Sequence, residues 1–342
     1  MRTLVTGGSG FLGRWIVERL LARGDAVRVM QRSPAPALAA RGVDVLQGDV
    51  EDPAEARAAV KNVDVVFHVA ARVGLHGAWG ELRRANVIGT RNLVDACLAE
   101  RVGRLVYTSS TQVVADAGVI EGGDEDTPYA TRWLSAYARS KAEAEQGVLA
   151  AHERGRLHTV ALRPQLLWGP GDRGFVPRVV EASRTRRVER VGGADVRVSM
   201  SYVEDVAAAH VLAASAIESP WAAAGGRAYF VCDTEPVSLW GFIDGLLADL
   251  GLPPIEGAMS YAAAWRLGLA LELAHRALGR RGEPRMTRPL AAAIGRSHWF
   301  KADRARRDLG WVPEVGPIEG RRRLLAWLGD GGLHTFRTFV DT

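Results

Sequence analysis

Close to its first residue the chain reads Leu4-Val5-Thr6-Gly7-Gly8-Ser9-Gly10-Phe11-Leu12-Gly13. A short apolar run leads into a glycine cluster, which opens into the helical pattern Trp15, Ile16, Leu20, Leu21. This order predicts a strand, a turn and a helix. Glycines at 7, 10 and 13 permit a tight turn and let backbone N–H groups approach a pyrophosphate at the positive end of the helix dipole. Glycine-rich turns also form for steric reasons alone. The dinucleotide site predicted here comprises Thr6, Gly7, Gly10, Phe11, Leu12 and Gly13.

Apolar runs with helical patterns between them recur along the chain, at 3–6, 26–30, 43–46, 63–69, 104–108, 159–162 and 227–231. Continuous apolar strands that alternate with helices predict a doubly wound α/β (Rossmann) fold, in which helices cover both faces of a parallel sheet. From Pro236 onward the pattern is mostly helical. We expect a dinucleotide-binding domain over 1–168, with 199–233 returning to it. A smaller, mostly helical substrate lobe is expected over 169–198 and 234–342.

The composition is that of a globular protein with a net charge of +5 and a pI near 9.5. Arginines concentrate in the last third of the chain, but acidic residues lie among them and few aromatic residues do, so we predict no nucleic-acid binding. A contact of this basic lobe with an anionic membrane surface or a pathway enzyme stays open. The pattern at 261–278 is too interrupted to span a bilayer, and an ordinary amphipathic helix is its simpler interpretation. Two cysteines, Cys97 and Cys232, and a start without an export signal predict a cytoplasmic protein.

The residues after the second predicted strand bear on cofactor choice. An acidic side chain at this position would bind the ribose hydroxyls of NAD, but the chain has Gln31, Arg32 and Ser33. Arg32 and Ser33 suit a 2′-phosphate, which favours NADP(H) over NAD(H), although Arg32 is alternatively only a solvated charge. Asp49 and Val50 end the third strand, where Asp49 either accepts from the adenine amino group or caps the next helix. The small residues Ala70 and Ala71 leave room for the cofactor after the fourth strand.

Chemistry is indicated most sharply by Tyr137 and Lys141, which share one helical face, and by Thr108-Ser109-Ser110 at a strand end. A lysine ammonium one turn from a tyrosine hydroxyl is expected to lower the tyrosine pKa from about 10, so that the phenol exchanges a proton with a carbonyl oxygen. A hydroxyl from the strand end would hold that oxygen. No His or Cys pair has metal-ligand spacing, so no metal is predicted.

These motifs, together with Asn86-Val87-Ile88-Gly89-Thr90, Leu162-Arg163-Pro164 and Trp168-Gly169-Pro170-Gly171, resemble the extended short-chain dehydrogenases/reductases. Within that superfamily the chain is most similar to the 3β-hydroxysteroid and sterol-4-carboxylate dehydrogenase branch, and especially to the bacterial 2-alkyl-3-oxoalkanoate reductases of olefin biosynthesis. Segments such as Glu121-Gly122-Gly123-Asp124-Glu125 and His298-Trp299 extend this likeness over nearly the whole chain.

The resemblance implies roles for individual residues. Tyr137 is implied as the general acid, Lys141 as its electrostatic partner that also holds the nicotinamide ribose, and Ser110 as the hydroxyl that orients the carbonyl. Ser109 and Thr111, one residue to either side, are the alternatives to Ser110 for this role. Asn86 is implied to brace the sheet, and Pro164 to line the nicotinamide. A homodimer is usual for the family.

The sequence therefore predicts an NADP(H)-dependent oxidoreductase that interconverts a ketone and a secondary alcohol on a hydrophobic substrate, such as a 2-alkyl-3-oxoalkanoate or a sterol. Alternatives are a nucleotide-sugar epimerase or dehydratase and a non-catalytic NADP(H)-binding regulator. His68 and His76 flank the predicted cleft, and His68 is interpreted as a packed strand residue. Tryptophans are expected to wall the substrate pocket, and Arg173 or Arg178 to bind an acid group. The tryptophans are Trp79, Trp133, Trp168 and Trp265.

Overall fold

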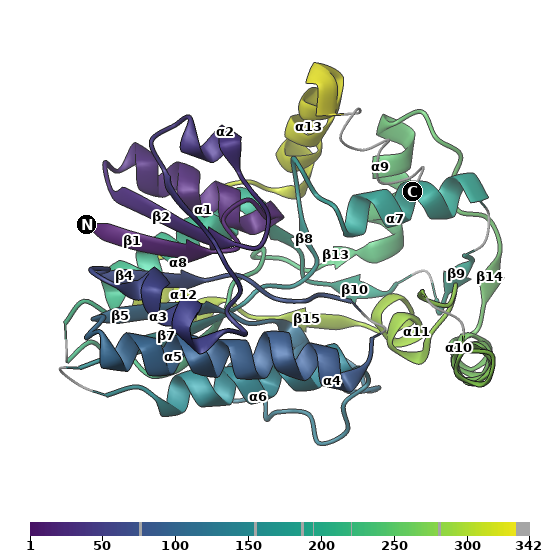
Figure 1. The fold of residues 1–342 in the computed structure, drawn as a ribbon. Coiled ribbons are helices and arrows are strands. Elements are labelled where there is room, and N and C mark those ends of the chain that lie inside the picture. The colour runs from purple at the N-terminus through teal and green to yellow at the C-terminus, as the bar shows by residue number, and fades with distance from the viewer. Residues whose placement is uncertain are drawn as a thin grey trace.

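The computed structural model describes residues 1–74, 77–153, 156–185, 188–193, 195–219, 221–279 and 282–332. At its centre is a seven-stranded parallel sheet in the order β12-β7-β5-β4-β1-β2-β3 (Figure 1), which confirms the predicted doubly wound α/β fold. The strands are β1 (Arg2–Thr6), β2 (Ala26–Gln31), β3 (Asp44–Gln47), β4 (Val65–His68), β5 (Arg104–Thr108), β7 (His158–Arg163) and β12 (Arg227–Phe230).

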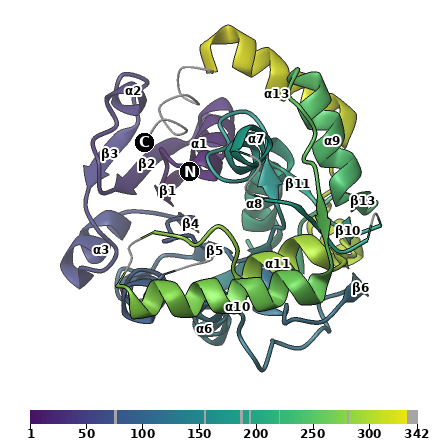
Figure 2. The ribbon, with the colours of Figure 1, turned by 90° about the vertical axis from the view of Figure 1, so that its right-hand side faces the viewer.

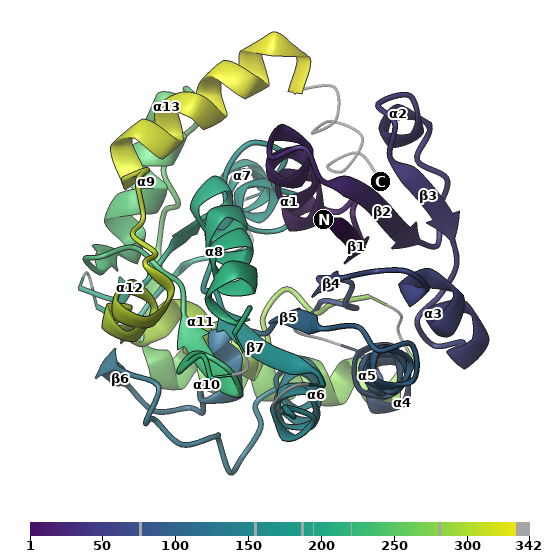
Figure 3. The same cartoon turned by 90° about the vertical axis from the view of Figure 1, so that its left-hand side faces the viewer.

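Helices cover both faces of this sheet (Figure 3). Successive strand residues point to opposite faces, so in β1 Val5 packs with α1 and α8 whereas Leu4 packs with α3 and α5. One face carries α1 (Phe11–Ala22), α8 (Val203–Ala216) and α12 (Asp303–Leu309). The other face carries α3 (Pro53–Val60), α5 (Gly89–Ala99) and α6 (Ala136–Ala150).

A second core lies beyond the carboxyl ends of the strands. Trp168, Tyr202, Phe242 and Leu246 are buried there between α7 (Phe175–Thr185), α9 (Leu239–Asp249) and α13 (Pro317–Trp327). A four-stranded sheet in the order β13-β10-β15-β6 joins this part to the rest. Its strands are β6 (Ile120–Gly123), β10 (Arg197–Val198), β13 (Val237–Ser238) and β15 (His298–Phe300).

The two parts exchange segments in a way that the sequence did not indicate. β6 lies within 1–168, yet it pairs with β15 in the small sheet. Conversely, α12 lies within 234–342, yet Ala305 and Leu309 pack in the core of the large sheet. The remaining pairs and helices are β8 (Leu167–Trp168) with β11 (Ser201–Tyr202), β9 (Arg190–Val191) with β14 (Ala258–Met259), α2 (Pro36–Ala39), α4 (Trp79–Leu82), α10 (Tyr261–Ala277) and α11 (Arg288–Gly295).

Three short helical stretches complete the fold: a π-helix over Arg83–Ile88, a 3-10 helix over Thr111–Val113 and a π-helix over Leu328–Gly332. In the described part of the chain, no helix has the length and apolar character needed to cross a membrane.

Gly13 is predicted to be intolerant of a side chain. A Cβ atom there would lie 2.2 Å from the Gly7 carbonyl oxygen, which is backbone and cannot swing away. We expect Gly13→Ala to lower the free energy of unfolding by about 1–3 kcal/mol. The matched control is Gly147→Ala in α6, where a Cβ meets nothing within 4 Å, and a gain of about 0.4–1 kcal/mol is expected. Urea titration of both variants checks this, and equal effects would contradict it.

Candidate active site

The glycine turn follows β1 at the carboxyl edge of the large sheet. Gly7 has a φ of +71°, and its N–H donates to the Met30 carbonyl over 2.8 Å. Gly10 is the N-cap of α1, whose first residues are Phe11 and Leu12. Because Gly13 packs directly on the Gly7 backbone, the start of α1 is held against the turn. The turn is therefore tight, and the N-terminus of α1 opens directly beside it.

Thr6 ties the turn to the end of β4. Its hydroxyl oxygen accepts from the Val69 and Ala70 N–H groups and lies 2.8 Å from His68 Nδ1. The other ring nitrogen of His68 lies 2.9 Å from Thr90 Oγ1. Burial, with Lys141 nearby, lowers the pKa of His68 to about 3, so the ring is neutral. His68 is therefore the packed strand residue that was expected. His76 lies outside the described residues.

The end of β2 places its residues beside the turn. Gln31 is buried, and its carboxamide accepts from the Ser9 N–H over 3.0 Å and donates to the Ser33 carbonyl over 2.7 Å. Arg32 and Ser33 are exposed, and no acidic side chain of the described residues forms an ion pair with Arg32. The guanidinium is thus available to an anion outside the protein.

Asp49 does not cap the helix that follows it. The N-cap of α3 is Asp52, whose carboxylate accepts from Ala54 and Glu55. Asp49 instead accepts from the Glu51 N–H over 3.0 Å, so the capping interpretation of Asp49 is wrong. Val50 is buried against Gly89 of α5. Ala70 and Ala71 are half-buried, and Ala70 lies against Gly7, where a Cβ would be 3.1 Å from the Ala70 Cα.

Tyr137 and Ser110 meet at the ends of α6 and β5. The Ser110 side chain lies close enough to the Tyr137 hydroxyl to lower its pKa, and Ser110 Oγ accepts from the Gln112 N–H over 3.2 Å. Ser109 Oγ is buried without a partner among the described residues, and Thr111 begins the 3-10 helix. The structure therefore brings Ser110, rather than the hydroxyls on either side of it, to Tyr137.

The expected lowering of the Tyr137 pKa by Lys141 is wrong for this structure. Burial raises the pKa of Tyr137 to about 12, and the nearby Ser110 side chain opposes the rise. The Lys141 ammonium donates to the Thr108 carbonyl and lies 4.2 Å from the centroid of the Tyr107 ring. Burial lowers the pKa of Lys141 to about 7, while the Glu145 carboxylate raises it. The two residues stand one turn apart on α6, but the Lys141 ammonium is not among the groups that shift the pKa of Tyr137.

Asn86 braces α6 from the first π-helix. Its carboxamide accepts from the Arg72 N–H over 2.7 Å and donates to the Arg72 carbonyl and to Ser140 Oγ, each over 2.9 Å. Ser140 Oγ in turn donates to the Tyr137 carbonyl over 2.8 Å. A π-helical turn often marks a functional region, and here it directs Asn86 at the helix that carries Tyr137.

A buried ion pair beneath α6 was missed by the sequence analysis. Arg163 Nη2 lies 2.6 Å from Glu145 Oε1, and these side chains are 4% and 0% exposed. The Tyr129 hydroxyl donates to the same carboxylate over 2.7 Å. Glu145 lies four residues after Lys141, so the helical spacing that identified Tyr137 and Lys141 could have found it.

A cavity of about 110 Å³ opens beside Ser110. The loop that carries Ser110 is held by a hydrogen bond from the Thr111 N–H to the Pro164 carbonyl. Gln112, Asp116, Gln165 and His298 are polar members of the wall. Its apolar part includes Leu134, Ala138, Leu166, Pro289, Ala292 and Phe300.

The expected tryptophan walls are absent from this cavity within the described chain. Trp168 is fully buried in the second core, Trp79 lies under the Arg139 guanidinium, and Trp133 and Trp265 pack elsewhere. Arg178 is paired with Glu283 over 2.8 Å, and neither it nor Arg173 is among the residues that line the cavity. Small, aliphatic and polar side chains make the wall instead, together with Phe300.

The remaining features concern the two cysteines and the side chains that bind metals in other proteins. Cys97 and Cys232 are buried free thiols, and burial raises the pKa of both. Over the residues that the structure describes, no three His, Cys, Asp or Glu side chains gather as a metal site would require.

Comparisons with known proteins agree with this geometry. The model of the 3-beta hydroxysteroid dehydrogenase/isomerase family matches residues 4–259. The 2-alkyl-3-oxoalkanoate reductase of Stenotrophomonas maltophilia is 44% identical over 95% of this chain and 99% of its own. The enzyme of the same name from Shewanella oneidensis is 40% identical over 95% of this chain and 85% of its own. Among solved structures, MoeE5 in complex with UDP-glucose and NAD superposes with a TM-score of 0.72 at 28% identity, over 97% and 99% of the two chains.

Removal of the Glu145 carboxylate is predicted to destabilise the protein strongly, because it leaves the buried Arg163 charge without its partner. We expect Glu145→Ala to cost about 3–5 kcal/mol of unfolding free energy. Glu143→Ala is the matched control: Glu143 pairs with Arg139 over 2.7 Å on the exposed side of α6 and should cost at most about 0.5 kcal/mol. Chemical denaturation of both variants measures the difference, and similar losses would refute a structural role for the buried pair.

Proposed function

From the premise that the chain belongs to the 3-beta hydroxysteroid dehydrogenase/isomerase family, within the extended short-chain dehydrogenases/reductases, we propose that it reduces the 3-oxo group of a 2-alkyl-3-oxoalkanoate with NADPH. The family assignment makes it an NAD(P)-dependent oxidoreductase that acts on CH–OH groups. The observation that carries the proposal is the position of Ser110, which lines a largely apolar cavity and lies close enough to the Tyr137 hydroxyl to affect its pKa.

The residues of the turn fit a dinucleotide. The close packing of Gly7, Gly13 and Ala70 keeps side chains away from the place where backbone N–H groups can meet phosphate oxygens. When bound, the dinucleotide supplies the hydride for the carbonyl carbon. Tyr137, Lys141 and Pro164 are the proposed neighbours of its nicotinamide end.

Tyr137 is the proposed proton donor. Its phenol, whose pKa burial raises to about 12, is protonated at neutral pH and so has a proton to give to the more basic alkoxide that develops on the substrate. Ser110 Oγ lies beside the Tyr137 hydroxyl and is placed to hold the same substrate oxygen. Lys141 is proposed to hold the nicotinamide ribose with its ammonium, although burial lowers its pKa to about 7. The Glu145 carboxylate favours this charged form of the lysine.

A preference for NADPH is proposed from the end of β2. No carboxylate follows that strand, and the carboxamide of Gln31 is already bonded to Ser9 and Ser33. Arg32 is exposed and can form a charge-assisted pair with a 2′-phosphate. Asp49 and Val50 are proposed to lie at the adenine end.

An alkyl-branched oxo acid suits the cavity better than a nucleotide sugar does. Sugar hydroxyls and a diphosphate call for many polar and cationic groups, whereas an oxo acid calls for a single cation. No lysine or arginine of the described chain is among the lining residues, so the wall accounts for the alkyl chains of the substrate and not for its acid group. The apolar wall formed by Leu134, Leu166 and Phe300 suits aliphatic chains. The cytoplasmic location and the homodimer stay predictions.

The reductase proposal is tested by following NADPH oxidation with a 2-alkyl-3-oxoalkanoate as substrate. We expect turnover with the native protein, and a loss of about 10²–10⁴-fold in kcat/KM for Tyr137→Phe, which removes the proton donor. Tyr261→Phe on α10 removes a tyrosine hydroxyl away from Ser110 and should keep its activity. Undiminished activity of Tyr137→Phe would reject the mechanism, and turnover of a 3-oxosteroid alone would reject the substrate.

Replacement of Arg32 is predicted to change cofactor choice. Loss of a charge-assisted contact with the 2′-phosphate costs about 1.5–3 kcal/mol, so Arg32→Ala should raise the Kd for NADPH by roughly 10- to 100-fold. The Kd for NADH should hardly change. Arg41→Ala removes another exposed arginine, paired with Glu18, and serves as the charge control. Fluorescence titration with both cofactors decides, because an unchanged NADPH/NADH ratio would exclude the contact.

A further inference from the structure

Helix α10 turns an unusually apolar face away from the protein. Figures 1 and 2 show it at the rim of the molecule, with α11 on its inner side. Leu269 and Leu273 are 38% and 55% exposed, and Leu278 just after the helix is 64% exposed. The outer face of α10 comprises the exposed residues Ala262, Ala263, Arg266, Leu269, Ala270, Leu273, Ala274, Arg276 and Ala277.

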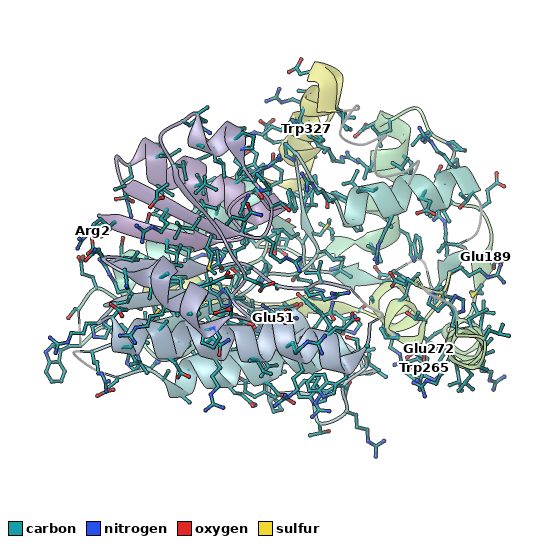
Figure 4. All side chains as sticks on the ribbon, in the orientation of Figure 1. Arg2, Glu51, Glu189, Trp265, Glu272 and Trp327 are labelled. Carbon is teal, nitrogen blue, oxygen red and sulfur yellow. The ribbon has the colours of Figure 1, made fainter. Side chains whose placement is uncertain are left out.

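The inner side of α10 is fully engaged with α11. Gly268 allows the close approach, since a Cβ there would lie 2.7 Å from the Arg288 nitrogen. Ala264 is buried in the same contact. Glu272, the acidic residue of this helix, faces α11 (Figure 4). It accepts from the Arg288 backbone N–H over 2.7 Å and from its guanidinium over 2.8 and 2.9 Å.

This packing decides the charge of the outer face. The carboxylate of Glu272 is held inward, while Arg266 and Arg276 are exposed among the leucines and alanines. The outer face is therefore apolar and cationic, without an acidic member. Arginine stems cover apolar surface while their guanidinium groups reach polar anions, which is the arrangement of helices that lie in a membrane interface.

A second copy of this chain fits the face less well. Pairing two outer faces would bring like charges from Arg266 and Arg276 together, and the face offers no carboxylate to neutralise them. Anionic lipid headgroups neutralise the arginines, and the acyl boundary accepts the leucines. We propose that the outer face of α10 docks on an anionic lipid surface.

The α10–α11 pair would then connect the lipid surface to the cavity. Pro289, Ala292 and Ala293 of α11 line the cavity beside Ser110. Docking through α10 would place this wall next to a reservoir of hydrophobic molecules. This benefit rests on the proposed function, whereas the docking itself depends only on the outer face.

Vesicle co-sedimentation of the full-length protein, without substrate or cofactor, tests the docking. We expect binding to phosphatidylcholine vesicles that contain phosphatidylglycerol, weaker binding to phosphatidylcholine alone, and release by salt. Arg266→Ala/Arg276→Ala should lower the affinity for anionic vesicles by roughly 30-fold, at about fivefold per arginine. Leu269→Ser/Leu273→Ser should lower it by roughly tenfold.

Ile318→Ser on α13 is the matched control, because Ile318 is 79% exposed on another surface and its loss should leave vesicle binding unchanged. Unchanged thermal melts show that the variants are folded. The docking is overturned if the native protein does not bind anionic vesicles, or if the α10 variants bind them with the same affinity as the native protein. It is also overturned if sedimentation of the protein without vesicles shows a dimer and the Leu269→Ser/Leu273→Ser variant is a monomer. A failed reductase assay leaves these outcomes untouched, so the two proposals fail separately.

Discussion

The arrangement of the site depends on the hydrogen bonds of the neutral His68 ring. This ring joins Thr6, at the glycine turn, to Thr90 on α5. From Thr90 the bonds continue through the Asn86 carbonyl, the Asn86 carboxamide and Ser140 to the backbone of Tyr137. A charged ring would need two acceptors, so burial, which keeps His68 neutral, also sets the direction of the chain. The cofactor turn and the helix of the proton donor are thereby fixed to one another.

Next to this chain of hydrogen bonds, ionisable side chains follow one another at intervals of one turn along α6. Tyr137 lies near Ser110, Lys141 follows one turn later, and Glu145 follows another turn later against Arg163. Burial opposes every charge here, so the Glu145–Arg163 pair supplies the carboxylate that supports the Lys141 ammonium. The same pair joins α6 to the end of β7. One interaction therefore contributes to both the fold and the electrostatics of the site.

The substrate side is built from small residues on separate segments. Ala138 comes from α6, Leu166 from the chain after β7, and Ala292 from α11, and together they surround a cavity that no single segment defines. The α10–α11 pair closes one side, since Gly268 lets the helices touch and Glu272 binds the start of α11. The pair has an inner surface at the cavity and an exposed outer surface on α10. The inward position of the Glu272 carboxylate leaves that outer surface without an acidic side chain.

The sequence by itself determined the alternation of strands and helices, the glycine turn and the common face of Tyr137 and Lys141, because these follow from local periodicity and from glycine spacing. It also showed that Arg32 stands where NAD binding would favour an acidic residue. Only the tertiary structure assigned the capping of α3 to Asp52 and replaced the expected tryptophans by alanines, leucines and polar side chains around the cavity. It also reversed the expected direction of the Tyr137 pKa. Burial and pairing arise between residues far apart in the chain, and local pattern carries no information about them.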